Sequence, residues 1–143
     1  MINVLTGINA TSSALEAERI RMEVISQNIA NAEVSRMPDG KPYQRQQVVF
    51  ETLLTQQTGG IGNGVGETGV QVARIEKDQR APRLVFNPGH KDADANGMVA
   101  MPDINIHEEM ADLISASRTF EANLAVVRNA RTMALQTLSI GKR

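Results

Sequence analysis

The chain has 143 residues and a formal net charge of −1, and it contains neither cysteine nor tryptophan. The absence of cysteine excludes disulfides, thiolate metal sites and a cysteine nucleophile, and the balanced charge without a basic block argues against nucleic-acid binding. The length suits one domain, but only 3% of the residues are aromatic, so aliphatic side chains must form most of the core.

The first predicted element is a helix over residues 4–32. Its apolar residues recur at every seventh position, which predicts a stripe that faces a partner helix. The first row is Ile8, Leu15, Met22 and Ile29, and the second row is Val4, Thr11, Glu18, Ile25 and Ala32. Ser13 followed by Glu16 could form a capping box, so we expect the helix to begin between Val4 and Ser13.

The same segment bears on localisation. It lacks the basic n-region and the apolar h-region of a secretory signal, and no apolar run in the chain approaches the ~18 residues of a membrane span. We therefore expect no cleavable signal peptide and no membrane span. A protein of this kind that works outside the cytoplasm needs another export route.

Residues 33–102 are expected to form a small β-rich insert. Pro38-Asp39-Gly40 signals a turn, and strands are expected over the following ranges: 43–54, 70–75, 84–86 and 98–101. Glycines concentrate between the first two strands, which predicts a flexible loop over residues 55–69, either a hairpin tip or a disordered segment. A phosphate-binding loop is the alternative, but no Gly-Lys-Ser/Thr follows the glycines.

A calcium site is a second alternative within the insert. Asp92-Ala93-Asp94-Ala95-Asn96-Gly97 matches the first half of an EF-hand loop. Asp103 would occupy the twelfth position, where a longer Glu normally binds, and Pro82 and Pro88 prevent an entering helix. A solvated turn rich in Asp, Asn and Gly explains the same residues, and we favour it.

Residues 106–140 predict a second long helix, capped by Asn105 with Glu108 at the third helical position. Its rows are Ile106, Leu113, Phe120, Val127 and Ala134, with Met110, Ser117, Leu124, Arg131 and Leu138. Ser117 and Arg131 are polar and interrupt the apolar stripe. This argues against a long self-sufficient coiled coil and favours a helix with neighbours on more than one side. An ion pair between Glu18 and Arg131 would join the interruptions of the two helices.

The predicted fold is therefore mainly α. Long N- and C-terminal helices form an antiparallel coiled-coil-like hairpin, with a small β-rich insert and a glycine-rich loop between them. Residues 1–32 and 103–143 would make one helical unit, and residues 33–102 would make the insert.

No catalytic constellation is visible in the sequence. The two histidines, His90 and His107, belong to no nucleophile–base–orienter set. Glu108 and Glu109 most simply complement the positive end of a helix, and the methionines suit packing. We expect no enzyme activity, no catalytic residue, no cofactor and no metal.

The assembled motifs resemble the flagellar axial (basal-body rod) protein family, and most closely its proximal-rod members. Four motifs follow in the family's order. The first is Ser13-Ala14-Leu15 with Asn28-Ile29-Ala30-Asn31-Ala32, and the second is Pro38-Asp39-Gly40 with Pro42-Tyr43-x-Arg45 and Val48-Val49-Phe50; the third lies within residues 94–105 and the fourth within residues 110–123. Residues 55–69 match nothing firmly. The resemblance covers nearly the whole chain, and four motifs in the right order around a small insert make it specific.

This resemblance implies a structural subunit of the flagellar rod, in the periplasmic part of the basal body. Such a subunit assembles through its terminal helices into the tube that transmits torque from motor to hook. The implied partners are proximal and distal rod subunits, further copies of the chain and the flagellar type III export apparatus, with no nucleic acid. The expected assembly interface is Ile8, Leu15, Met22, Ile25, Asn28, Ile29, Asn31, Ile106, Met110, Leu113, Phe120, Asn123, Leu124, Val127 and Leu138.

Two other classes stay open from the sequence. A cytosolic coiled-coil adaptor is the alternative from a different class, and it would be stably helical as a free dimer. A distal-rod or hook subunit of the same axial family is the closer alternative, but such proteins usually carry a larger insert than this chain does.

Overall fold

The computed structural model describes residues 2–54 and 68–141. Two long helices flank a β-rich insert in the order of the chain: α1 is Ile2–Ala30 and α2 is Ile106–Ile140. The strands of the insert are β1 (Gln46–Leu54), β2 (Thr68–Lys77), β3 (Arg83–Phe86) and β4 (Met98–Met101). The predicted order of helix, small β-rich insert and helix is confirmed.

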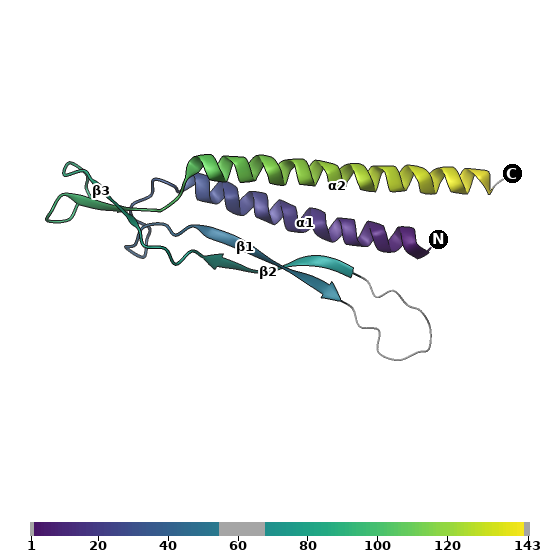
Figure 1. Ribbon diagram of the computed structural model, residues 1–143, viewed down its shortest axis with the longest axis horizontal. Helices are drawn as coiled ribbons and strands as arrows, with labels where there is room; N and C mark the ends of the chain where they lie inside the picture. Colours follow the sequence, from purple (N-terminus) through teal and green to yellow (C-terminus); the bar gives the residue numbers. More distant parts are fainter. Residues whose placement is uncertain (1, 55–67, 142–143) are drawn as a thin grey trace.

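The two helices lie side by side and run in opposite directions along an elongated molecule (Figure 1). Small side chains mark their close approach, since Ala116 is fully buried and Ala17 nearly so. α2 runs past the start of α1, and every residue from 131 to 140 is exposed. The last turns of α2 therefore present all their sides to solvent.

α1 is the middle layer of the molecule. β1 and β2 form an antiparallel hairpin that packs along α1 on a different side from α2 (Figure 1). Val24 and Ile25 are buried between these layers. A bulge opposite Val49 and Phe50 leaves Ala73 of β2 unpaired, which increases the local twist. The heptad rows of α1 predicted one facing helix. The β1–β2 hairpin is a second packing partner of α1 that these rows did not predict.

Ser13 and Gly69 bring α1 and β2 together. The Ser13 Oγ accepts a hydrogen bond from the Val70 backbone N at 3.1 Å and donates one to the Ala10 carbonyl oxygen at 2.8 Å. A Cβ on Gly69 would lie 3.1 Å from that Oγ, so a residue without a side chain permits the approach. Thr68 and Gly69 thus belong to β2 and not to the predicted loop; the rest of that prediction, residues 55–67, lies outside the described residues.

The start of α1 differs from the prediction. The helix begins at Ile2, which leaves Ser13 in its interior, and Glu16 pairs with Arg19 at 2.7 Å. The predicted capping box is therefore wrong. The C-terminal end of α1 lies at Ala30, two residues before the predicted end, and β1 begins at Gln46 rather than at residue 43.

The proposed ion pair between Glu18 and Arg131 is also wrong. Asn28 contacts Glu109 across the antiparallel helices, so ten residues from each of them Glu18 lies level with Thr119. Arg131 is twelve residues further along α2, about 18 Å at ~1.5 Å per residue. Glu18 instead lies 3.9 Å from Arg21 of its own helix.

β3 and β4 form a second hairpin beyond the ends of the helices (Figure 1). Val85 pairs with Val99, which is fully buried, so one face of this hairpin packs inward. Leu84 and Phe86 lie on the other face, because side chains alternate along a strand. Both are exposed, at 63% and 69%.

The segment 92–97 is the second part of the loop that joins β3 to β4, which runs from residue 87 to residue 97. The Asp94 Oδ1 accepts hydrogen bonds from the backbone N of Met98 at 2.9 Å and of Asn96 at 2.8 Å. Both bonds lower the pKa of Asp94, and the bond from Met98 has the larger effect. Gly97 has φ +75°, a conformation that favours glycine. The turn interpretation is confirmed, and its other carboxylate, Asp92, accepts from the Ser35 Oγ at 2.8 Å.

Candidate assembly surface and the polar junction that positions it

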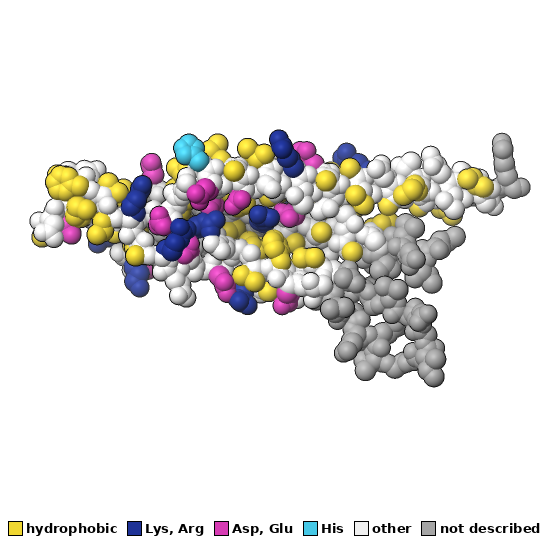
Figure 2. All heavy atoms as spheres, viewed as in Figure 1, with side chains coloured by type: hydrophobic (Ala, Val, Ile, Leu, Met, Phe, Trp, Pro, Cys, Tyr) yellow, Lys and Arg dark blue, Asp and Glu magenta, His cyan; other side chains and the backbone are white. Residues whose placement is uncertain are grey.

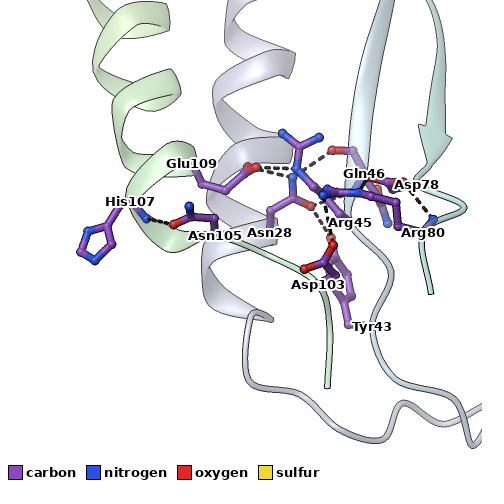
Figure 3. Close-up of polar contacts among 10 residues, drawn as sticks. All are labelled: Asn28, Tyr43, Arg45, Gln46, Asp78, Arg80, Asp103, Asn105, His107 and Glu109. Carbon is purple, nitrogen blue, oxygen red and sulfur yellow. Dashed lines mark hydrogen bonds and ion pairs between the residues drawn. The ribbon is translucent and has the colours of Figure 1, made fainter. Parts of the chain in front are cut away.

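Asn28, in the last turn of α1, is the centre of a buried polar junction (Figure 3). Its Nδ2 donates to the Glu109 Oε2 at 3.0 Å and to the Gln46 carbonyl oxygen at 2.9 Å. Its Oδ1 accepts from the Tyr43 hydroxyl at 3.0 Å and from the Gln46 backbone N at 2.9 Å. The amide thus uses both donors and both lone pairs. One side chain therefore ties α1 to the start of β1, to the preceding connector and to α2.

Glu109 brings a charge into the junction from the first turn of α2. It is 1% exposed, and its Oε1 lies 2.5 Å from the Arg45 Nε. A buried carboxylate is stable only when it is paired and hydrogen-bonded, and Arg45 and Asn28 supply both conditions. Burial raises the pKa of the neighbouring Tyr43 hydroxyl, and the charge of Glu109 adds to that effect.

The role of Glu109 is one that the sequence did not reveal. Glu109 lies in the first turn of α2, where its negative charge complements the positive end of the helix dipole. That was the role predicted for it. Its partner Arg45 is 64 residues away in the sequence, so no local pattern could indicate the ion pair. The predicted cap is confirmed: the Asn105 Oδ1 accepts from the His107 backbone N at 3.1 Å.

A second polar link lies beside the junction (Figure 3). The Arg80 Nε donates to the Asp78 Oδ2 at 2.7 Å, and the Arg80 Nη1 lies 3.0 Å from the Asp103 Oδ2. The Arg80 backbone N and then its side chain lower the pKa of Asp78 by hydrogen bonding. This link joins the segment after β2 to the segment that leads into α2. Together with the junction at Gln46, this link ties both ends of the β1–β2 hairpin to the same end of the helix pair.

Within residues 2–54 and 68–141, no group of three His, Cys, Asp or Glu could hold a metal ion. His90 accepts from the Asp92 backbone N through Nδ1 at 3.1 Å, and His107 is exposed at the start of α2. An open groove of about 350 Å³ lies next to the junction, between α1, β1 and the first turns of α2, and includes Arg21, Phe50 and Asp112.

The predicted interface residues fall into two groups in the structure. The larger group is buried or half-buried and faces the rest of the chain: Ile8, Leu15, Met22, Ile25, Asn28, Ile29, Asn31, Leu113, Phe120, Asn123, Leu124 and Val127. The smaller group is exposed: Ile106, Met110 and Leu138. The structure brings Asn28 against α2, whereas the Asn31 side chain donates within its own turn, to the Gln27 carbonyl oxygen at 2.8 Å. Their assignment to an assembly interface stays a prediction.

Further apolar side chains on α2 are exposed and were not among the predicted interface residues. Val126, Met133 and Ile140 are each more than half exposed, and they recur at every seventh residue. That spacing is the signal that could have found them. Ile114 and Leu135 are exposed as well. The space-filling view shows apolar side chains spread along the surface of α2 (Figure 2), and such surface is typical of contact sites.

Comparison with known proteins identifies the family. A model described as "Flagella basal body rod protein" matches residues 8–36, and one described as "Flagellar basal body rod FlgEFG protein C-terminal" matches residues 95–140. The flagellar basal-body rod protein FlgC of Borreliella burgdorferi is 40% identical, over 97% of this chain and 98% of that protein. FlgC of Yersinia enterocolitica is 39% identical, over 99% and 100%. The chain belongs to the FlgC family.

A more distant FlgC, from Bacillus subtilis, is still 36% identical over 94% of this chain and 96% of that protein. The likeness therefore includes the β insert as well as the two helices. Family membership confirms the resemblance read from the motifs. The chain is a structural protein of the flagellar basal-body rod and not an enzyme, and the cytosolic adaptor alternative is set aside.

Two findings bear on where the chain is placed. The family locates it in the basal-body rod. Within the part of the chain that the structure describes, no helix has the length and apolar content needed to cross a membrane.

Proposed function

We propose that the chain is a subunit of the proximal part of the rod and that it assembles through α1 and α2. One observation carries the proposal. One side of α2 is already occupied by α1, yet Val126, Met133 and Ile140 form a regular apolar row that is exposed. A row of this spacing suits a second helix. Neighbouring subunits supply that helix in an assembled tube.

In this proposal the two helices form a coiled-coil-like hairpin. Residues 1–32 and 103–143 make the helical unit of the rod wall, and residues 33–102 make the insert that reaches adjacent subunits. The polar junction around Asn28 and Glu109 supports this division, because it ties the insert to the helices through buried bonds. A rigid tie of this kind suits a part that transmits torque from the motor to the hook.

The partners follow from the same proposal. They are proximal and distal rod subunits, further copies of the chain and the flagellar type III export apparatus. The chain would reach the periplasmic part of the rod without a cleavable signal peptide. A chain without cysteine forms no disulfides that would have to be reduced before export in an unfolded state.

The substitution Val126→Asp tests the proposal in cells where the variant replaces the native chain. In the isolated protein this residue is 53% exposed, so the free energy of unfolding should change by less than about 0.5 kcal/mol. In the assembly the change removes a buried apolar contact worth about 1.5 kcal/mol and buries a carboxylate without a partner. Incorporation into purified basal bodies should fall more than about tenfold.

Arg128→Ala is the matched control, since Arg128 is an exposed residue of the same helix two positions away. Its incorporation should stay close to that of the native chain. Urea unfolding of both purified variants separates an assembly defect from a folding defect. Normal incorporation and normal swimming with Val126→Asp would overturn the proposal that the exposed row of α2 is an assembly surface.

A further inference from the structure

The outer edge of β1 has backbone groups that point away from β2. The Gln46 backbone N and carbonyl oxygen both bond to the Asn28 side chain of α1, at 2.9 Å each (Figure 3). On the inner side, the Arg45 carbonyl oxygen accepts from the Asp78 backbone N at 2.7 Å. Along a strand at the edge of an antiparallel pair, successive residues turn their backbone groups alternately toward and away from the partner. The register does not shift before the bulge, so the N–H and C=O of Val48 also point away from β2.

The edges of β1 and β2 differ in their protection against further pairing. Exposed sheet edges are usually blocked by charged side chains, prolines or bulges. β2 has three charged residues among its last four and the bulge at Ala73. The first five residues of β1, 46–50, include no charge and no proline. The Asn28 amide bonds to the first of them as a paired strand would. Within the described part of the chain, no side chain does the same for Val48, so the edge is open to a third strand.

This edge forms one wall of the open groove of about 350 Å³ beside the junction. α1 is the floor, with the buried side chains Val24 and Ile25, and the first turns of α2 form the opposite wall. Phe50 of β1 lines the groove as well and is 37% exposed. Strand addition takes its affinity from backbone hydrogen bonds and its specificity from pockets for alternate side chains. A free edge beside an apolar floor supplies both.

The wall formed by α2 holds a charge without a partner. Asp112 forms no ion pair with any residue that the structure describes, although it lines the groove. The other charges nearby are offset within the chain. Arg45 pairs with Glu109, and the Arg21 Nη1 lies 3.9 Å from the Glu18 Oε1. The groove therefore favours an incoming segment that brings a positive charge.

Asp112 and Val48 lie at nearly the same level on the two walls. Asn28 joins Glu109 of α2 to Gln46 of β1, and both elements run away from this point in the same direction (Figure 1). Asp112 is three residues further along α2, about 4.5 Å at ~1.5 Å per residue. Val48 is two residues further along β1, about 7 Å at ~3.3 Å per residue. A strand paired with Val48 thus has Asp112 on its other side.

We propose that an extended segment of a neighbouring rod subunit lies in this groove as a third strand, paired with β1 and with a lysine or arginine opposite Asp112. The inference rests on the proposed function, because the rod supplies the neighbour. It adds a contact through the insert to the contacts through the helices. A strand of a few residues buries far less than the ~1,200 Å² of a stable interface. The contact should therefore form in the rod and not between free subunits.

Val48→Pro tests the backbone pairing. Proline lacks the N–H that a third strand needs, and it is tolerated on an edge strand where that group faces solvent. Val48→Ala is the matched control, since it shortens the same side chain and keeps the N–H. In cells where each variant replaces the native chain, basal bodies should contain at least about tenfold less Val48→Pro than Val48→Ala. Urea unfolding of the two purified chains should give closely similar midpoints.

Asp112→Lys tests the charge, and it takes the place of Val48→Pro should that variant not fold. A lysine here repels the basic side chain of the third strand, so incorporation should fall by at least about tenfold. Asp112→Glu keeps the charge and is the matched control, and its incorporation should stay close to that of the native chain. Normal incorporation of Asp112→Lys would overturn the assignment of a basic side chain to this position.

Hydrogen exchange of the native chain identifies the mode of binding. The Val48 amide should exchange at least about tenfold more slowly in purified basal bodies than in the free subunit, because pairing protects it. The Gln46 amide bonds to Asn28 in both states and should change less. Unchanged exchange at Val48, or equal incorporation of Val48→Pro and Val48→Ala, would overturn the third strand. If Val126→Asp is excluded from the rod while Val48→Pro is incorporated normally, the proposed function stands and the third strand alone is removed.

Discussion

Replacement of Asn28 by Ala is the most informative perturbation of the isolated protein. The change removes four hydrogen bonds at once and leaves Glu109 Oε2 and the Tyr43 hydroxyl without their partner in a buried setting. Each buried polar group that loses its partner costs about 1–3 kcal/mol, and a charged one costs more. The Gln46 backbone atoms lie in a partly buried position that water can reach, so the loss of their bonds to Asn28 adds less to the free-energy cost. The expected loss in the free energy of unfolding is therefore about 2–6 kcal/mol, against a total of about 5–15 kcal/mol for a typical domain.

Asn31→Ala is the matched control, because it is the same substitution three residues along in the same motif. The Asn31 side chain makes one exposed hydrogen bond, to the Gln27 carbonyl oxygen, so its loss should cost less than about 1 kcal/mol. Urea unfolding followed by circular dichroism at 222 nm measures both. If the two variants lose the same free energy within about 0.5 kcal/mol, the junction does not hold the helices and the insert together, and the reasoning is refuted.

Three further predictions concern other parts of the chain. Phe120→Asp should impair both the stability of the isolated chain and incorporation into the rod, unlike Val126→Asp, because Phe120 is only partly exposed on the stripe that faces α1; urea unfolding and basal-body content check this. Gly69→Ala should destabilise the chain through its contact with Ser13, and a double-mutant cycle with Ser13→Ala should show a coupling of about 0.5–1 kcal/mol. The folded pKa of Asp94 lies below its ordinary value of 3.8, so its stabilising effect is complete above that value and is lost as the pH falls through the lowered pKa. Asp94→Asn should flatten the fall of Tm between pH 4 and pH 2.

The long elements could be predicted because their signals are local. Heptad rows located the end of α1 to within two residues, although its start was expected between Val4 and Ser13 and lies at Ile2. The second helix, α2, begins and ends where predicted, with Asn105 as its cap. The turn at Asp94 and Gly97 was predictable for the same reason, since its hydrogen bonds join residues that are close in the sequence. These features depend on backbone geometry within a few residues.

The polar junction could not be predicted because its members are far apart in the chain. Asn28, Arg45 and Glu109 meet across separations of 81 and 64 residues, and each has an ordinary local explanation. Asn28 reads as a polar residue near a helix end, and Glu109 reads as a complement to the helix dipole. The capping box at Ser13 failed because α1 already begins at Ile2, so Ser13 lies in the helix interior, where its side chain bonds to the distant strand at Val70.

The exposed row of α2 shows another limit of prediction from sequence, in which the local pattern is clear but fits more than one face of the helix. Val126, Met133 and Ile140 have heptad spacing, yet the stripe of Leu113, Phe120 and Val127 has it too, and periodicity alone cannot decide which row meets α1. Burial decides it, since the first row is exposed and the second is half-buried. The sequence thus predicts several helical neighbours, and the structure shows which side of α2 is left for neighbouring subunits.

The most direct test of the assembly claim is the imaging of a basal body at side-chain resolution. The account predicts that α1 and α2 of each copy lie in the wall of the rod, with Val126, Met133 and Ile140 buried against a helix of an adjacent subunit. It also predicts that Asn28, Arg45 and Glu109 keep their contacts within each copy. A rod in which this row of α2 faces solvent, with the neighbouring subunits held by the β insert alone, would contradict the account.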